Sequence, residues 1–151
     1  MAQPIRIYVA APWKDKPLAR EAKRKLEADG FVVTSRWVDF HENKPADQSG
    51  LNYDKDTLLQ EARQDVEDVM TCDILILLNT QKRGEETSGK AVETGLAMAW
   101  LKPVIVVGEV SNIFHHLCPV VATLEDAVKT IRGWEEQRSR IVAPQSLVIP
   151  A

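Results

Sequence analysis

Two uninterrupted runs of apolar residues place the strongest constraint on the fold. Residues 74–78 read Ile-Leu-Ile-Leu-Leu, and residues 103–107 read Pro-Val-Ile-Val-Val. A strand with one face in water alternates apolar and polar side chains, whereas a strand covered on both faces is apolar throughout. Both runs therefore predict central strands of a parallel sheet, covered on each side.

Strand-like and helix-like segments alternate along the whole chain. The predicted strands cover residues 5–10, 31–38, 74–78, 103–107 and 120–122. The predicted helices cover residues 12–30, 54–70, 88–101 and 124–138, with Gly30 as the stop signal of the first. This alternation predicts an α/β fold: a single-domain, doubly wound, mostly parallel five-stranded sheet with helices on both faces, flavodoxin- or Rossmann-like.

The 151 residues suit one domain, which we place at residues 1–140. Residues 141–151 form an apolar tail broken by two prolines, expected to add an edge strand or to contact a neighbouring subunit. In the second predicted helix, five apolar residues share one side and indicate an amphipathic helix. These residues are Leu58, Leu59, Ala62, Val66 and Val69.

Composition excludes several classes of function. The net charge is -3 and the basic residues are scattered, which argues against a nucleic-acid or membrane surface. No segment approaches the roughly 18 apolar residues of a membrane helix, and the amino terminus has no signal-peptide pattern, so we expect a cytoplasmic protein. Cys72 and Cys118 stand outside any metal-binding spacing, so we expect reduced thiols and neither a metal nor a cofactor.

In open α/β sheets, ligands bind beyond the carboxyl ends of the strands. Four segments qualify: residues 10–16, 39–53, 79–93 and 108–116. The chain has no phosphate-binding P-loop, GxGxxG, HExxH or GxSxG motif. The familiar nucleotide, metal and serine-nucleophile signatures are therefore absent from the sequence.

Glu93 is the strongest catalytic candidate on residue pattern. It leads a helical stripe that is otherwise apolar and follows the polar turn formed by Thr87, Ser88, Gly89 and Lys90. Burial there raises a carboxyl pKa, while a helix amino terminus favours the ionised form. A hydroxyl pair, a glycine and a lysine at a helix start also suit an anion site, although simple capping explains the same residues.

Other candidates are weaker taken singly. Asp73 precedes a predicted buried strand and Asp39 follows one, and Trp13 lies where it could stack on a base. His115 and His116 are adjacent, so their side chains diverge, and a structural role fits them better than a metal site.

Three segments resemble the signature regions of the nucleoside 2-deoxyribosyltransferase superfamily, which includes 2′-deoxynucleoside 5′-monophosphate N-glycosidases. They are IYVAAPW at residues 7–13, CDIL at residues 72–75 and SGKAVETG at residues 88–95. The resemblance covers the chain from its first strand to about Asn112, and Glu93-x-Gly95-x-Ala97 is its most specific part.

The resemblance implies cleavage of the N-glycosidic bond of a 2′-deoxynucleoside or its monophosphate through a covalent deoxyribosyl-enzyme. Glu93 is then the nucleophile and Tyr8 orients it, while Asp73 contacts or protonates the leaving base. Trp13 lines the base pocket, and Asn112 completes the site of a neighbouring subunit, which implies a homodimer or larger assembly. A second base resolves the intermediate in a transferase, and water resolves it in a hydrolase.

Thr87 departs from the transferase pattern. Transferases of this group carry an acidic residue there, whereas the monophosphate N-glycosidases carry a hydroxyl, so Thr87 favours a phosphorylated substrate. The segment after the first strand lacks the glycosidase pattern, which leaves nucleoside and monophosphate both open. The alternatives are a nucleotide-sensing module without catalysis, and a ribonucleotide or NAD glycohydrolase.

Overall fold

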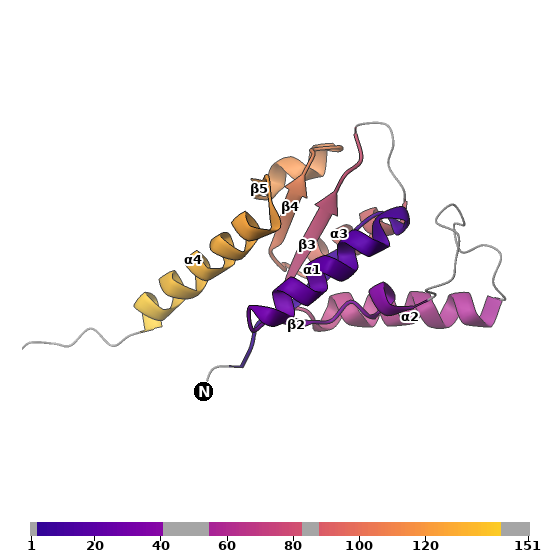
Figure 1. The fold of residues 1–151 in the computed structure, drawn as a ribbon, viewed down its shortest axis with the longest axis horizontal. Helices are drawn as coiled ribbons and strands as arrows, with labels where there is room; N and C mark the ends of the chain where they lie inside the picture. The colour runs from indigo at the N-terminus through magenta and orange to yellow at the C-terminus, as the bar shows by residue number, and fades with distance from the viewer. Residues whose placement is uncertain (1–2, 41–54, 83–87, 143–151) are drawn as a thin grey trace, which may run out of the picture.

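The computed structural model describes residues 3–40, 55–82 and 88–142. Five parallel strands form one sheet in the order β2-β1-β3-β4-β5, as Figure 1 shows in part. The strands are β1 (Arg6–Ala10), β2 (Val32–Val33), β3 (Ile74–Asn79), β4 (Val104–Gly108) and β5 (Val120–Val121). The predicted doubly wound α/β fold with a five-stranded parallel sheet is confirmed.

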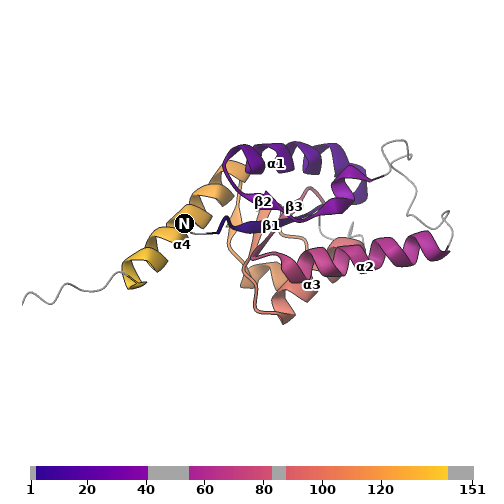
Figure 2. The same cartoon turned by 90° about the horizontal axis from the view of Figure 1, so that it is seen from below.

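Helices cover both faces of this sheet. Helix α1 (Lys16–Ala28) lies on one face, and α2 (Lys55–Thr71) and α3 (Ser88–Ala99) lie together on the other, as Figure 2 shows. Helix α4 (Leu124–Val142) follows β5 and approaches the end of α1, where Arg132 lies 4.3 Å from the ring centre of Phe31. Strand β3 is buried along its whole length, as its apolar run predicts.

The first predicted helix divides into two elements. A 3-10 turn, η1 (Trp13–Asp15), precedes α1, which carries a proline in its first turn. Helix α1 ends two residues before Gly30, whose φ of +89° is a left-handed conformation that glycine adopts without strain. The predicted role of Gly30 as a stop signal is therefore confirmed.

The second strand is much shorter than the predicted segment 31–38. After Val33, the chain leaves the sheet and enters η2 (Arg36–Asp39). Side chains replace the missing ladder bonds, because Ser35 Oγ accepts from Val9 N at 3.0 Å and Trp37 Nε1 donates to Val9 O at 2.9 Å. The alternating pattern was therefore misleading, because Trp37 and Val38 are buried through a turn of 3-10 helix and not through a strand.

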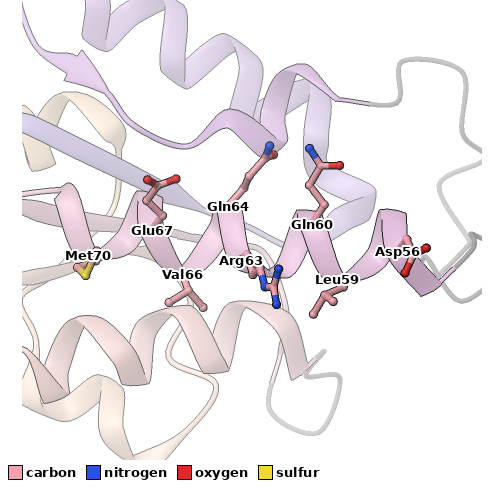
Figure 3. A pocket seen from close by; sticks show the side chains of 8 residues that line it. All are labelled: Asp56, Leu59, Gln60, Arg63, Gln64, Val66, Glu67 and Met70. Atoms are coloured by element: carbon pink, nitrogen blue, oxygen red, sulfur yellow. The ribbon is translucent and has the colours of Figure 1, made fainter.

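Helix α2 buries Asp68 and leaves three of the five residues of its predicted apolar stripe exposed. Of the five residues in its predicted apolar stripe, only Val69 is fully buried, while Leu59, Ala62 and Val66 are exposed. Figure 3 shows Leu59 and Val66 on the same side of the helix, away from Gln60 and Gln64. Prediction of a conventional amphipathic helix was wrong here, because carboxylates occupy part of the side that faces the sheet.

Candidate active site

The centre of the site is a hydrogen bond between a strand and a helix. Tyr8 in β1 is fully buried, and its hydroxyl donates to Glu93 Oε1 of α3 at 2.8 Å. Alternate residues of a strand point to opposite faces of the sheet, so Tyr8 projects towards α3 while its neighbours Ile7 and Val9 project the other way. The structure therefore brings together two residues that are 85 positions apart in the sequence.

Burial dominates the electrostatics of Glu93. Desolvation raises the pKa of Glu93 to about 8; the hydrogen bond from Tyr8 opposes this rise, and the negative charge of Asp65 adds to it. Burial, followed by the charge of Glu93, also raises the pKa of Tyr8 well above its ordinary value. Tyr8 is therefore a neutral donor, and Glu93 is a carboxyl group that changes its protonation state near neutral pH.

Asp65 of α2 is a second titrating carboxyl group that the sequence predictions missed. Its negative charge contributes to the raised pKa of both Tyr8 and Glu93. Burial, and then the charges of Asp68 and Glu61, raise the pKa of Asp65 to about 7. The spacing carried a usable signal, because Glu61, Asp65 and Asp68 recur at helical intervals and lie on one face of α2.

Arg36 compensates the neighbours of Asp65 directly. Its guanidinium bonds to Asp68 Oδ1 at 2.8 Å and to Glu67 Oε2 at 2.6 Å, and its backbone N–H donates to Asp68 Oδ2 at 2.9 Å. The attraction of Arg36 lowers the pKa of Asp65 less than burial and the acidic neighbours raise it. Asp65 and Glu93 are thus the two carboxyl groups of the site with raised pKa values.

Asp73 lies away from this pair. It precedes β3, at the amino edge of the sheet, where it accepts from Arg6 N and from Arg6 Nη2 at 2.8 Å each. The hydrogen bond from Arg6 lowers the pKa of Asp73 below its ordinary value, and an ionised carboxylate has no proton to give. This geometry does not support the predicted contact of Asp73 with a leaving base.

The predicted residues at the end of β1 and β2 lie near the carboxyl edge. The rings of Trp13 and Trp37 are 6.0 Å apart between centroids, and Lys16 Nζ lies 4.7 Å from the Trp13 ring centre. Asp39 pairs with Lys23 of α1. Trp13 remains half-exposed at this edge, whereas the ion pair directs Asp39 towards α1.

Asn112 begins the short helix η3 (Ile113–Leu117) beyond β4. Its Oδ1 accepts from Phe114 N at 2.9 Å and from His115 N at 3.3 Å, so it caps η3. A cavity of about 480 Å³ separates this turn from α3, and Lys90, Met98, Asn112 and Phe114 are among the residues that line it. No hydrogen bond joins Asn112 to Glu93 within the described part of the chain.

The polar turn before Glu93 is only partly described. Ser88 and Gly89 open α3, and a Cβ added at Gly89 would meet open space. Thr87 lies outside the described residues. A second cavity, of about 660 Å³, lies along the outer side of α2 and includes none of the predicted site residues (Figure 3).

Within residues 3–40, 55–82 and 88–142, no three His, Cys, Asp or Glu side chains gather closely enough to hold a metal ion. Among the same residues, none of the helices has the length and apolar character needed to cross a bilayer.

Comparison with known proteins gives one family and several related folds. The family described as "Nucleoside 2-deoxyribosyltransferase" matches residues 7–134. No curated protein matched the sequence.

Solved structures show the same fold at low sequence identity. A conserved protein from Enterococcus faecalis V583 superposes with a TM-score of 0.61 at 17% identity, covering 87% of this chain and 99% of that one. A 2-deoxyribosyltransferase from Bacillus psychrosaccharolyticus gives 0.59 at 20% identity, covering 81% and 89%. A CMP N-glycosidase from Clostridium botulinum gives 0.51 at 17% identity, covering 84% and 98%.

Proposed function

The chain belongs to the nucleoside 2-deoxyribosyltransferase family, and from this membership we propose that it cleaves the N-glycosidic bond of a 2′-deoxynucleoside or its 5′-monophosphate. The observation that carries the proposal is the hydrogen bond from the buried Tyr8 to Glu93. A buried carboxylate stabilises an oxocarbenium-like transition state and can form an ester with the sugar.

In the proposed first step, Glu93 Oε attacks C1′ of the sugar while the bond from C1′ to the base nitrogen breaks. The electron pair of that bond leaves with the base, and Asp65 supplies the proton that neutralises it. Tyr8 holds Glu93 in the attacking orientation through its hydroxyl. In the second step, water or another base attacks C1′, Glu93 departs as a carboxylate, and the proton of the incoming group returns to Asp65.

The raised pKa values of Asp65 and Glu93 supply the single proton that this mechanism needs, but they favour its position on Glu93, so the proton has to pass to Asp65 before Glu93 attacks. At a pH between about 7 and about 8, the two carboxyl groups together hold about one proton. One carboxylate and one carboxylic acid are what the first step needs. Asp65 replaces Asp73 in the role of acid, because Asp73 is paired with Arg6 at the other edge of the sheet.

The remaining substrate contacts come from the carboxyl edge. Trp13 offers an aromatic face on which the base can stack. Asp39 contacts the substrate only when its ion pair with Lys23 opens. For a monophosphate, we place the phosphate at the start of α3, near Ser88 and Gly89, because the first N–H groups of a helix lack partners within the helix and suit an anion; Thr87 comes just before this turn in the sequence. An acidic residue at position 87 would repel the same group.

We further propose that two copies of the chain associate through the face formed by α2, α3 and η3. Large apolar side chains are exposed across it, including Val92 at 60%, Ile113 at 72%, Phe114 at 59% and Leu117 at 77%. Where exposed apolar side chains gather into a large patch, the patch usually marks an interaction surface. Association would cover the cavity beside α3 and bring Asn112 of one copy towards the site of the other.

The test is chromatography of the base released from a panel of deoxynucleosides and their 5′-monophosphates, each with and without a second free base. Release from a monophosphate without acceptor identifies a hydrolase, and a new nucleoside formed only with acceptor identifies a transferase. Glu93→Gln should abolish either reaction. The proposal would be contradicted if the wild-type protein released no base from any compound of the panel, or released it only from ribonucleotides or NAD.

A further inference from the structure

Four buried polar side chains form a hydrogen-bonded chain that the proposed reaction does not use. Asn79 ends β3, Lys90 lies in the first turn of α3, and Ser111 and His115 belong to the η3 turn. Each is exposed by 5% or less. Burial of polar groups, and of an ammonium above all, costs free energy that their hydrogen bonds at best offset. Apolar side chains would therefore fill this part of the core at a lower free-energy cost.

Asn79 is the hub of the chain. Its Oδ1 accepts from Lys90 Nζ, and its Nδ2 donates to Ser111 Oγ at 2.9 Å and to Glu109 O at 2.6 Å. One side-chain amide thus holds α3 through its acceptor and the turn after β4 through its donors. Because the two ends of the amide are chemically different, each partner has only one place to bind.

The backbone reinforces the same junction. Gly108 has a φ of +105°, and a Cβ added to it would lie 2.5 Å from Asn79 O. Glu109 N donates to that oxygen at 3.0 Å. Only glycine permits this close approach and this φ, so the end of β3 fixes the path of the chain as it leaves β4.

From Ser111 the chain of contacts continues to Asn112. Ser111 N donates to His115 Nδ1 at 3.2 Å, and His115 Nε2 lies 3.1 Å from Asn112 Nδ2. Asn112 in turn caps η3 through its Oδ1. The contacts therefore connect the helix that carries Glu93 with the turn that carries Asn112.

We propose that Asn79 is a positioning residue that fixes the spacing between Glu93 on α3 and Asn112 at η3. Helix α3 is held to the sheet at two polar points one helical turn apart: Glu93 to Tyr8 on β1, and Lys90 to Asn79 on β3. The inference rests on the proposed function: in a dimer with shared sites, the junction at Asn79 sets the position of Glu93 in one site and of Asn112 in the other. A misplacement of about 1 Å in such a site can lower the rate by about a hundredfold.

Two variants change the hydrogen bonds of Asn79 in different ways. Ser111→Ala removes one acceptor of Asn79, and Asn79→Asp keeps an acceptor for Lys90 but loses both donors. Thr130→Val is the matched control, since it removes a half-buried hydroxyl that donates to Asp126 O at 2.9 Å on α4. We expect both hub variants to lower kcat about ten- to a hundredfold with a smaller change in KM, and the control to stay within about twofold.

Amide hydrogen exchange supplies a readout that does not depend on turnover. In the wild-type chain the Phe114 and His115 amides donate to Asn112, so they should exchange faster in both hub variants and at the wild-type rate in Thr130→Val. Normal kcat in both hub variants, or unchanged exchange at η3, would overturn the proposal. If the wild-type chain releases no base, the proposed function fails, whereas the exchange result still decides whether Asn79 holds η3 in place.

Discussion

Glu93→Gln should make the protein more stable than the wild type at alkaline pH. The pKa of Glu93 in the folded chain sets an upper limit on the gain. Glu93 is half-buried against Tyr8, and burial raises its pKa from 4.5 to about 8. The folded chain therefore binds more protons than the unfolded chain between these values, so the free energy of unfolding falls as the pH rises through this range. Glutamine keeps the shape and a hydrogen-bond acceptor but never ionises.

The magnitude follows from the change in pKa. A rise from 4.5 to about 8 makes ionisation of Glu93 roughly 4–5 kcal/mol more costly in the folded state. Water that reaches the half-buried carboxyl group reduces this, so we expect about 2–3 kcal/mol between pH 5 and pH 9. For a chain of this length, that corresponds to a difference in Tm of about 5–10 °C.

Thermal unfolding of both proteins, followed by circular dichroism at pH 5, 7 and 9, measures the effect. The Tm of Glu93→Gln relative to wild type should rise steadily with pH. Glu27→Gln, at an exposed position of α1, is the control and should show the same difference at each pH. A Tm difference for Glu93→Gln that stays constant from pH 5 to pH 9 would refute the reasoning about its ionisation.

The remaining predictions concern turnover and assembly. Asp65→Asn should lower kcat about 10²–10⁴-fold for ordinary bases, and far less for a substrate whose base leaves readily as an anion. If kcat falls equally for both kinds of substrate, Asp65 is not the acid. A pH series of kcat/KM should peak between about pH 7 and pH 8, because the site needs one protonated and one ionised carboxyl group; a flat profile from pH 5 to pH 10 would count against this pair. Phe114→Lys should convert a dimer into folded, inactive monomers in sedimentation, whereas Leu18→Lys on α1 should not; a monomeric wild type would remove the proposed interface.

Much of the fold could be predicted because it depends on local pattern. The apolar run of β3 and the glycine stop of α1 act through burial and backbone conformation, which the sequence displays directly. Strand β2 could not be predicted at its true length, because Ser35 and Trp37 bond to the backbone of β1 only when the chain has already folded. Hydrogen bonds from side chains that replace those of a sheet ladder produce no periodic pattern in the sequence.

The residues of the site were likewise only partly predictable from the sequence. Glu93 was predicted as a single carboxyl group at the head of an apolar stripe, and the structure pairs it with Tyr8 as the family resemblance implies. The role of Asp73 was predicted from the family resemblance, but a residue that directly precedes a strand of a parallel sheet lies at the amino edge, away from the ligand end of the strands. The helical spacing of Glu61, Asp65 and Asp68 was visible in the sequence, but only the exposure of Leu59 and Val66 shows that the apolar stripe of α2 is not its buried side.

Both edges of the sheet end in strands of only two residues, β2 and β5. A short edge strand offers few unpaired N–H and C=O groups, so it is a poor template for another chain to extend. Copies of this protein are therefore discouraged from joining into continuous sheets or fibres. Any specific assembly has to be encoded by side chains on the helical faces, where single substitutions can tune its strength without disturbing the backbone of the sheet.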